Sequence, residues 1–293
     1  MDSGTRQVTY EGSEMNAVTR PLLRYFGGKW QMRHWIVDLL PPHDYYAEPF
    51  AGAASILLAK EPAPQGEIIN DLNGDVVNLF RVMQSREQGD ELIRRLEWTP
   101  FARAELEVSR EQSSDPIERA RRMLIRSFMG IEVAGIESSK TGFRMGNVDL
   151  ARLDQEGKAT FRNCARDWEN WKQAAGAIRN RLANVMIYER DAFEFIDLMD
   201  APTCLLYVDP PYAHETRAQT RYAVEFTDHA RLVTRLLSCK AMVVLSGYVN
   251  SAYEPLEAAG WARKERKSRA NMSDDPRMEC LWISPNAQQP ELI

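Results

Sequence analysis

Short apolar runs alternate with amphipathic helical patterns in two parts of this 293-residue chain, and few folds accommodate such an alternation. Uninterrupted apolar strands are typical of a parallel sheet that is covered on both faces. The sequence therefore predicts an α/β fold with a mainly parallel, doubly wound sheet. Two last runs, near 261–267 and 280–284, predict a C-terminal antiparallel hairpin at the sheet edge. The apolar runs of the parallel part lie at 45–50, 67–70, 185–188, 204–208 and 241–245.

Between the two parts lies a stretch with helical character. Thr99-Pro100 and Asp115-Pro116 are typical helix starts, with a capping side chain followed by proline. A polar, glycine-containing segment, 138–163, predicts a loop or hairpin. We therefore expect a frayed tail over 1–19, a main domain formed by 20–84 together with 185–293, and a mostly helical inserted domain over 85–184. A helical stripe closes the insertion, at Trp168, Trp171, Ala175, Ile178 and Leu182.

The net charge of −5 conceals an asymmetry. Segment 117–190 has 14 Lys and Arg against 9 Asp and Glu, so it carries +5 and the rest of the chain −10. A second basic run occupies 263–269. Local basic surfaces, and not the total charge, hold phosphates. Charge alone leaves two interpretations open for each run, a solvated face or a nucleic-acid contact.

Several classes of protein are excluded or disfavoured. No stretch approaches the roughly 18 consecutive apolar residues of a membrane span, so we expect no membrane association. Residues 1–16 lack the apolar core of a secretion signal, and a reducing cytoplasm fits the cysteine usage. The four histidines form no metal-ligand pattern, so no metal site is predicted. The cysteines are at least 35 positions apart, at Cys164, Cys204, Cys239 and Cys280.

Ligand sites of open parallel sheets lie at the carboxyl ends of the strands. The first exit is a turn of small residues at 48–55, where a backbone can approach a ligand closely. The second is Asp71, which follows Gly52 by 19 positions and so matches the offset of about 20 for an acid that binds ribose hydroxyls. Either feature alone is common in purely structural roles, as a turn or a helix cap. Their spacing favours a nucleotide-like ligand.

The third exit is the most specific, because the apolar run 204–208 leads into Asp209, Pro210, Pro211 and Tyr212. Two prolines fix an extended backbone there. The lone pair of an aromatic amine such as that of adenine is delocalised into the ring, so the amine is a poor nucleophile. The Asp209 carboxylate and the Pro210 carbonyl, accepting its two hydrogens, would stabilise the positive charge that grows during methyl transfer. Tyr212 would stack on the base.

Two further segments are candidates. Asp191, in Glu-Arg-Asp-Ala-Phe at 189–193, follows a strand and either caps the next helix or contacts a ligand. The Gly-Gly bend at 27–28 lies between Tyr25 and Lys29 but lacks the full phosphate-loop spacing, so we expect it to direct these two side chains to a ligand at the sheet edge.

Four motifs in this order resemble the Dam-type DNA adenine methyltransferases: Arg-Tyr-Phe-Gly-Gly-Lys at 24–29, Glu-Pro-Phe-Ala-Gly at 48–52, Asn-Asp-Leu-Asn at 70–73 and Asp-Pro-Pro-Tyr at 209–212. The resemblance covers roughly 20–80 and 185–285. It implies a Rossmann-like sheet, S-adenosylmethionine as methyl donor, and double-stranded DNA with a flipped adenine as substrate. It extends to methyltransferases of restriction–modification systems. The insertion shows no match to a known DNA-reading hairpin, so the target sequence stays open.

The resemblance also implies residue roles. Asp209, Pro210, Pro211 and Tyr212 would form the catalytic tetrad. For DNA contact we expect basic residues of the insertion, Arg119, Arg122, Arg126, Lys140, Arg144 and Arg166. The cofactor site is expected to comprise Tyr25, Gly28, Lys29, Glu48, Phe50, Gly52, Asp71, Asp191, Phe193 and Asp209.

The acting unit is expected to be a monomer or a weak dimer. Two other functions stay open on sequence alone. One is methylation of a cytosine amine or an RNA base, and the other is a non-catalytic DNA-binding module, which the intact tetrad disfavours.

Overall fold

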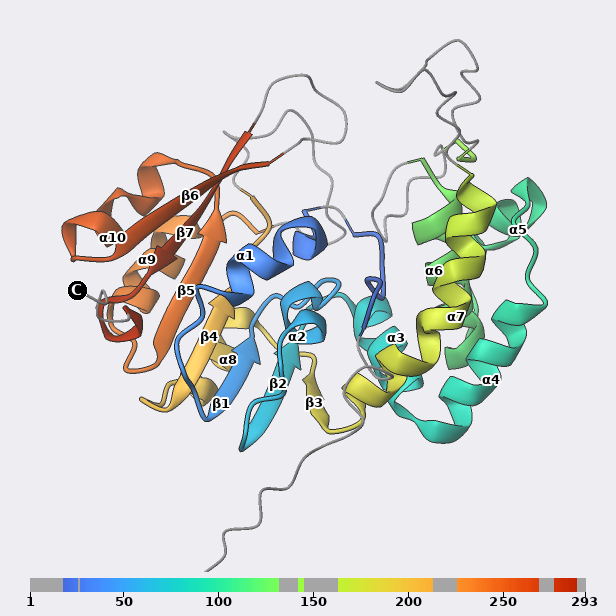
Figure 1. The fold of residues 1–293 in the computed structure, drawn as a ribbon, viewed down its shortest axis with the longest axis horizontal. Helices are drawn as coiled ribbons and strands as arrows, with labels where there is room; N and C mark the ends of the chain where they lie inside the picture. The colour runs from blue at the N-terminus through green and yellow to red at the C-terminus, as the bar shows by residue number, and fades with distance from the viewer. Residues whose placement is uncertain are drawn as a thin grey trace, which may run out of the picture.

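The computed structural model describes residues 18–25, 27–131, 142–144, 163–212, 226–268 and 277–288. These residues form a seven-stranded sheet with the strand order β3-β2-β1-β4-β5-β7-β6, flanked by helices (Figure 1). The strands are β1 (Tyr45–Glu48), β2 (Gly66–Asn70), β3 (Val185–Tyr188), β4 (Cys204–Val208), β5 (Met242–Gly247), β6 (Ala262–Ser268) and β7 (Arg277–Ile283).

The first five strands are parallel, and β7 lies antiparallel between β5 and β6. The predicted mainly parallel sheet with a C-terminal antiparallel hairpin is therefore confirmed. Because β1 and β4 are neighbours although they lie far apart in sequence, the strand order reverses between them. In open sheets a ligand binds at such a reversal, beyond the carboxyl ends of the strands.

Helices cover both faces of the sheet. On one face, α1 and α2 pack against side chains such as Tyr46 and Leu205, which lie in one apolar core. On the other face, α8, α9 and α10 pack against side chains such as Leu206 and Val243. These helices are α1 (Arg33–Val37, after the 3-10 turn η1, Lys29–Met32), α2 (Ser55–Ala59), α8 (Ala192–Met199), α9 (His229–Leu237) and α10 (Glu254–Ala258, after η3, Ser251–Tyr253).

The remaining helices form a layer beside β3 (Figure 1). The predicted stripe of α7 is buried, and Trp168 and Trp171 stack with their ring centroids 5.9 Å apart. The buried side chains of this layer continue the apolar core that contains Tyr46. The layer comprises α3 (Gly74–Gln84), α4 (Arg86–Glu97), α5 (Arg103–Val108), α6 (Pro116–Met129) and α7 (Cys164–Leu182).

Of the two helix starts predicted from the sequence, one is confirmed. Asp115 caps α6 by accepting a hydrogen bond from the Ile117 amide, with Pro116 at the first helical position. The start predicted at Thr99-Pro100 is wrong, because α5 begins at Arg103. The Thr99 hydroxyl instead donates backward to the Arg95 carbonyl at 2.8 Å. Most of segment 138–163 lies outside the described residues.

Within the described ranges, no helix combines the length and apolar character that crossing a bilayer requires.

Candidate active site

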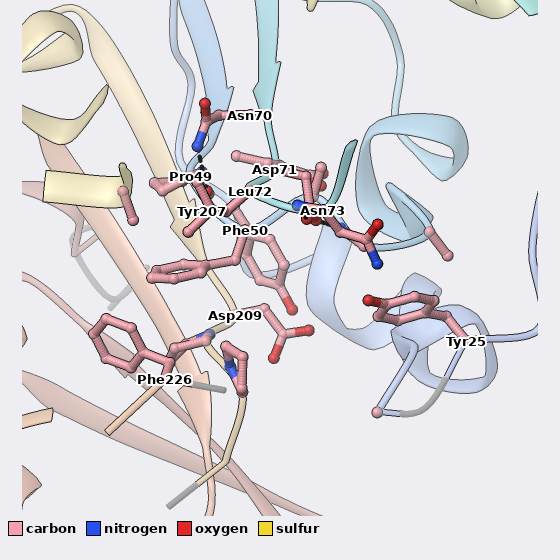
Figure 2. A pocket seen from close by; sticks show the side chains of 18 of the residues that line it. Tyr25, Pro49, Phe50, Asn70, Asp71, Leu72, Asn73, Tyr207, Asp209 and Phe226 are labelled. Carbon is pink, nitrogen blue, oxygen red and sulfur yellow. Dashed lines mark hydrogen bonds between the residues drawn. The ribbon is translucent and has the colours of Figure 1, made fainter. Parts of the chain in front are cut away.

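Strand exits of β1, β2, β3 and β4 meet at one pocket on the carboxyl edge of the sheet. Figure 2 shows Tyr25 on one side of this pocket, Phe50 and Phe226 on the other, and the Asp209 carboxylate between them. The structure thus brings together most of the residues that the sequence predicted for the site. Those that line the pocket are Tyr25, Gly28, Lys29, Glu48, Phe50, Gly52, Asp71, Asp191, Asp209, Pro210 and Pro211.

The turn after β1 depends on an unusual backbone. Gly52 has φ +50°, and Ala54 also lies in the left-handed region, with φ +46°. A Cβ atom added to Gly52 would lie 3.2 Å from a ring carbon of Tyr25. The Tyr25 ring therefore packs directly on the Gly52 backbone, and any other residue here would be strained by the positive φ and would push against this ring.

Asp71 links this turn to the next exit. One carboxylate oxygen accepts from the Gly52 amide and the other from the Asn73 amide, both at 2.8 Å. Burial raises the pKa of Asp71, and the amides of Asn73, Gly52 and Leu72 partly oppose this increase. A carboxylate has about four acceptor positions, so Asp71 can still receive a hydroxyl from a ligand beside these amides.

Asn70 ties three exits together, although its role was not predicted. Its amide nitrogen donates to the carbonyls of Pro49 and Arg190, each at 3.0 Å, and its oxygen accepts from the Arg190 amide at 2.9 Å. Because Asn70 is buried, these bonds fix the loops after β1, β2 and β3 relative to one another. The sequence places Asn70 at a strand end and within the Asn-Asp-Leu-Asn motif, but neither signal assigned it this role.

The predicted catalytic carboxylate forms an ion pair with Lys29. The ammonium nitrogen lies 2.7 Å and 2.9 Å from the two oxygens of Asp209, and it also donates to the Gly27 carbonyl at 2.8 Å. The Lys29 side chain is 3% exposed and that of Asp209 is 19% exposed. The Gly-Gly bend therefore directs Lys29 inward to the exit of β4, as the sequence suggested.

A second carboxylate, Glu279 of β7, was missed by the sequence analysis. It accepts from the Tyr212 hydroxyl at 2.7 Å and from the Ser246 hydroxyl at 2.9 Å, and it lies 3.6 Å from the Lys29 ammonium. Lys29 in turn donates to the Tyr212 oxygen at 2.5 Å. Glu279 follows Tyr212 by 67 positions, so no local pattern could have connected them.

The two carboxylates share one cation, and this determines the charge of Asp209. Burial raises the pKa of Asp209 to about 6; Lys29 lowers it, and Glu279 raises it. For Lys29, burial alone would lower the pKa, but Asp209 and Glu279 outweigh it and raise the value. Lys29 is therefore charged, and Asp209 is ionised at neutral pH but close to its titration range.

Glu48 lines the same pocket in a different electrostatic state. One of its oxygens accepts from the Tyr46 hydroxyl at 2.8 Å and from the Leu57 amide at 2.9 Å. Burial nevertheless raises the pKa of Glu48 to about 8. At neutral pH this carboxyl is mostly protonated, so it contributes a polar but uncharged wall.

Aromatic rings form the opposite wall. Phe226 packs edge-on against Phe50, with centroids 5.1 Å apart, and Phe193 packs behind Phe226 at 6.0 Å. Phe193 is buried in the core and is not among the pocket-lining residues, unlike the prediction. Asp191 does line the pocket, and it also caps α8 by accepting from the Phe193 amide at 2.9 Å.

The basic residues predicted to contact DNA are placed unequally. Arg119 pairs with Asp75 at 2.7 Å, Arg122 with Glu118 at 2.7 Å, and Arg126 lies 3.5 Å from Asp75. All three guanidinium groups therefore face acids of the protein, although Asp75 serves two of them. Arg166 is exposed on the first turn of α7, Arg144 is half-buried, and Lys140 lies outside the described residues.

The pocket fits a ligand that is partly polar and partly aromatic. Its wall combines the carboxylates described above with Tyr25 and Phe50, and the buried Ser55 hydroxyl has no hydrogen-bond partner among the described residues. An unsatisfied buried hydroxyl is costly unless a ligand completes it. These features suit a nucleoside with a charged amino-acid tail, as in S-adenosylmethionine. Over the same residues, no group of three or more His, Cys, Asp or Glu side chains could hold a metal ion.

Comparison with known proteins agrees with the geometry. Over 70 residues the chain is 34% identical to the type II methyltransferase M1.LlaDCHI of Lactococcus lactis subsp. cremoris. The match spans 24% of each protein, so the chain covers about a quarter of this curated relative's length. The family model of the D12 class N6 adenine-specific DNA methyltransferases matches residues 25–255, from Tyr25 of the pocket to beyond β5. With its four motifs converging on one pocket, this chain belongs to the D12 class N6 adenine-specific DNA methyltransferase family.

Proposed function

We propose that this chain transfers a methyl group from S-adenosylmethionine to the exocyclic amine of an adenine in double-stranded DNA, as a site-specific adenine methyltransferase. The observation that carries the proposal is the Asp209 carboxylate, held by Lys29 at the rigid exit of β4 inside the pocket. We further propose that the protein acts in the cytoplasm, as a monomer or a weak dimer.

The cofactor would lie along the exits of β1 and β2. We assign Asp71 to the ribose hydroxyls, the Tyr25 ring and the wall around Phe50 to the apolar parts, and the Gly52 turn to close backbone approach. When bound, S-adenosylmethionine supplies an electrophilic methyl group on a positively charged sulfur. The walls position that group and exclude water from it.

The target amine would enter beside Asp209. The Asp209 carboxylate and the Pro210 carbonyl accept its two hydrogens, which favours a pyramidal nitrogen with an available lone pair. An amine that took up the methyl group would have to release one proton. A carboxylate with a pKa of about 6 is a suitable first acceptor for that proton at neutral pH.

The base must leave the duplex to reach this depth, which costs a few kcal/mol. Tyr212 is the ring assigned to stack on it. Tyr212 is held by its hydroxyl on Glu279 and by contact with the Tyr248 ring, whose centroid lies 4.4 Å away. Tyr212 is buried and is not among the pocket-lining residues, and these contacts fix the orientation in which its ring would meet the base.

The product of the reaction tests this proposal. We expect purified protein with S-adenosylmethionine and duplex DNA to yield N6-methyladenine, detected by mass spectrometry after digestion to nucleosides. The rate of methyl transfer by the Asp209→Ala variant should fall about 100-fold or more, the typical effect of removing a preorganised catalytic contact. The variant should still bind DNA. Methylcytosine as the product, or wild-type activity in the variant, would overturn the assignment. Methylation of RNA but not DNA would do the same.

A further inference from the structure

We propose that one face of the edge strand β6, carrying Lys264 and Arg266, binds the sugar–phosphate backbone of the substrate duplex. This inference rests on the proposed function, since it takes duplex DNA as the partner. It assigns a DNA contact to the sheet edge, whereas the sequence analysis expected the contacts in the helical insertion.

The exposure of β6 is the first observation. Residues 263–267 are all exposed, and four of the five are basic. Among the strands that the structure describes, β6 is the last of the sheet, and it pairs with β7 (Figure 1). Lysines on an edge strand also serve to block pairing with other proteins, so exposure and charge do not by themselves establish a contact.

The second observation is that most of these charges have no ion-pair partner among the described residues. Arg263 pairs with Glu257 at 2.7 Å and with Glu265 at 2.9 Å. In contrast, no ion pair forms at Lys264, Arg266 or Lys267 with any residue that the structure describes. Uncompensated cations are those that can exchange their counterions for phosphates. The paired arginines of α6 described above are poorer candidates for this exchange.

The third observation is where the strand ends. β5 and β6 both lie antiparallel to β7, so β6 runs parallel to β5 and its last residues reach the edge that holds the pocket. Arg266 is directly opposite Glu279 in the register. Adjacent strands lie about 5 Å apart, so Arg266 is one strand away from the carboxylate that binds the Tyr212 hydroxyl.

The register also selects a face. Side chains alternate along a strand, and directly opposite residues of an antiparallel pair share a face. Lys264 and Arg266 therefore share the face of Glu279, and the Arg266 guanidinium lies 5.9 Å from the centre of the Trp35 ring of α1. Lys267 points to the opposite face. A backbone lying on the first face would pass beside the pocket into which the base is to be flipped.

Salt dependence of DNA binding tests the proposal without requiring catalysis. Affinity of the full chain for a fluorescent duplex is measured by anisotropy over a series of KCl concentrations. Each phosphate contact contributes about 0.9 to the slope of log K against log salt. We expect Lys264→Gln/Arg266→Gln to reduce the slope by about 1.8 relative to wild type, and to raise KM for DNA while kcat and cofactor affinity are retained.

Two matched variants serve as controls. Lys267→Gln removes one charge from the same strand but from the other face. Arg86→Gln/Lys240→Gln removes two exposed charges near the opposite edge of the sheet, beside the starts of β3 and β5. Both should keep the wild-type slope, and circular dichroism should show native folding for all variants.

Each other outcome rejects the proposal. An unchanged slope for the β6 double variant shows that β6 bears no contact, and an equal decrease for the distant double variant shows a mere effect of net charge. Failure of the proposed function is recognised separately. If the protein binds duplex with the expected slope change but forms no N6-methyladenine, the β6 contact is supported and the proposed reaction is rejected. If the wild type binds no duplex, both proposals are rejected.

Discussion

Two carboxylates face a single ammonium in the candidate site, and their imbalance sets the behaviour of the catalytic one. Asp209 forms the short ion pair with Lys29, whereas Glu279 lies 3.6 Å from the ammonium and binds the Tyr212 hydroxyl. Burial raises the pKa of Asp209 to about 6; Lys29 opposes this rise, and Glu279 adds to it because one positive charge cannot fully compensate two negative charges. We propose that Glu279 is a positioning residue, which would act on Asp209 through Lys29 and Tyr212.

The Glu279→Gln variant should reveal this coupling in the pH profile. In wild type, kcat/KM is expected to fall as the pH drops through about 6, because protonated Asp209 cannot accept both the amine hydrogen and the released proton. Removing the charge of Glu279 removes a contribution that raises the Asp209 pKa, so the acidic limb should move to lower pH. Glu279→Ala should move the limb in the same direction and also reduce kcat by roughly tenfold, since the Tyr212 hydroxyl loses its acceptor.

Glu67→Gln is the matched control for this prediction. Glu67 is also a buried carboxylate paired with a lysine, Lys60, at 2.7 Å, and it lies near the start of β2, at the opposite end of the strand from Asp71. The acidic limb of the pH profile of Glu67→Gln should coincide with that of wild type. A limb that stays in place in Glu279→Gln would show that Glu279 does not influence the protonation of Asp209.

At the scale of elements, the junction of β1 with α2 carries an electrostatic cost. Glu48 is the last residue of β1. Its carboxyl accepts hydrogen bonds from the Tyr46 hydroxyl of the same strand and from the Leu57 amide of α2. The pKa of Glu48 rises from the ordinary 4.5 to about 8 through burial. Between these pH values the folded protein holds a proton that the unfolded chain releases, so stability decreases as the pH rises across this window.

Glu48→Gln should therefore stabilise the fold most at high pH. Glutamine keeps the accepting oxygen for Tyr46 and Leu57 but has no charge to bury. We expect the melting temperature of the variant to exceed that of wild type by roughly 5 °C at pH 8, and by little at pH 5. Thermal melts without cofactor measure this. Glu67→Gln should show the opposite sign at pH 8, because Arg181 and Lys60 outweigh burial and lower the pKa of Glu67.

Elements were predictable where local signals decide them. The runs 185–188 and 204–208 form β3 and β4 with the predicted bounds, and Asp115 caps α6 as expected, because apolar runs and caps are properties of neighbouring residues. Thr99 failed as a helix start since its buried hydroxyl donates to the Arg95 carbonyl, while the Trp168 indole donates to the Thr99 carbonyl at 3.0 Å. That contact spans 69 positions and leaves no trace in the local pattern.

At the scale of the whole molecule, only those site residues could be predicted that directly follow a recognisable strand. Asp71 and Asp209 were identified because each directly follows an apolar run. Glu279 and Asn70 were not assigned a role, because their importance comes from partners in distant parts of the chain. The same reason explains why the ion pairs of the α6 arginines were not predicted. The acid that pairs with Arg119 lies 44 positions earlier, at the start of α3.

The predicted inserted domain, 85–184, leads to a prediction about cooperativity. Its described helices share one apolar core with the sheet, and they also hold the segment that presents Tyr25. The Trp171 indole donates to the Leu22 carbonyl at 3.1 Å, and Ser127 accepts from the Arg24 amide at 2.8 Å. A unit joined in this way to the main sheet should not unfold on its own.

We therefore expect one unfolding transition for the whole chain, with coincident denaturant midpoints by tryptophan fluorescence and far-ultraviolet circular dichroism. Leu124→Ala, at a fully buried position of α6, should shift this single transition by about 2–5 kcal/mol. It should also weaken cofactor binding in step with global stability near the midpoint, because Tyr25 depends on the same helices. The opposite result would be two separated transitions, with the insertion melting first in Leu124→Ala. That result would establish the insertion as an independently folding domain and would show that the sheet forms the pocket without it.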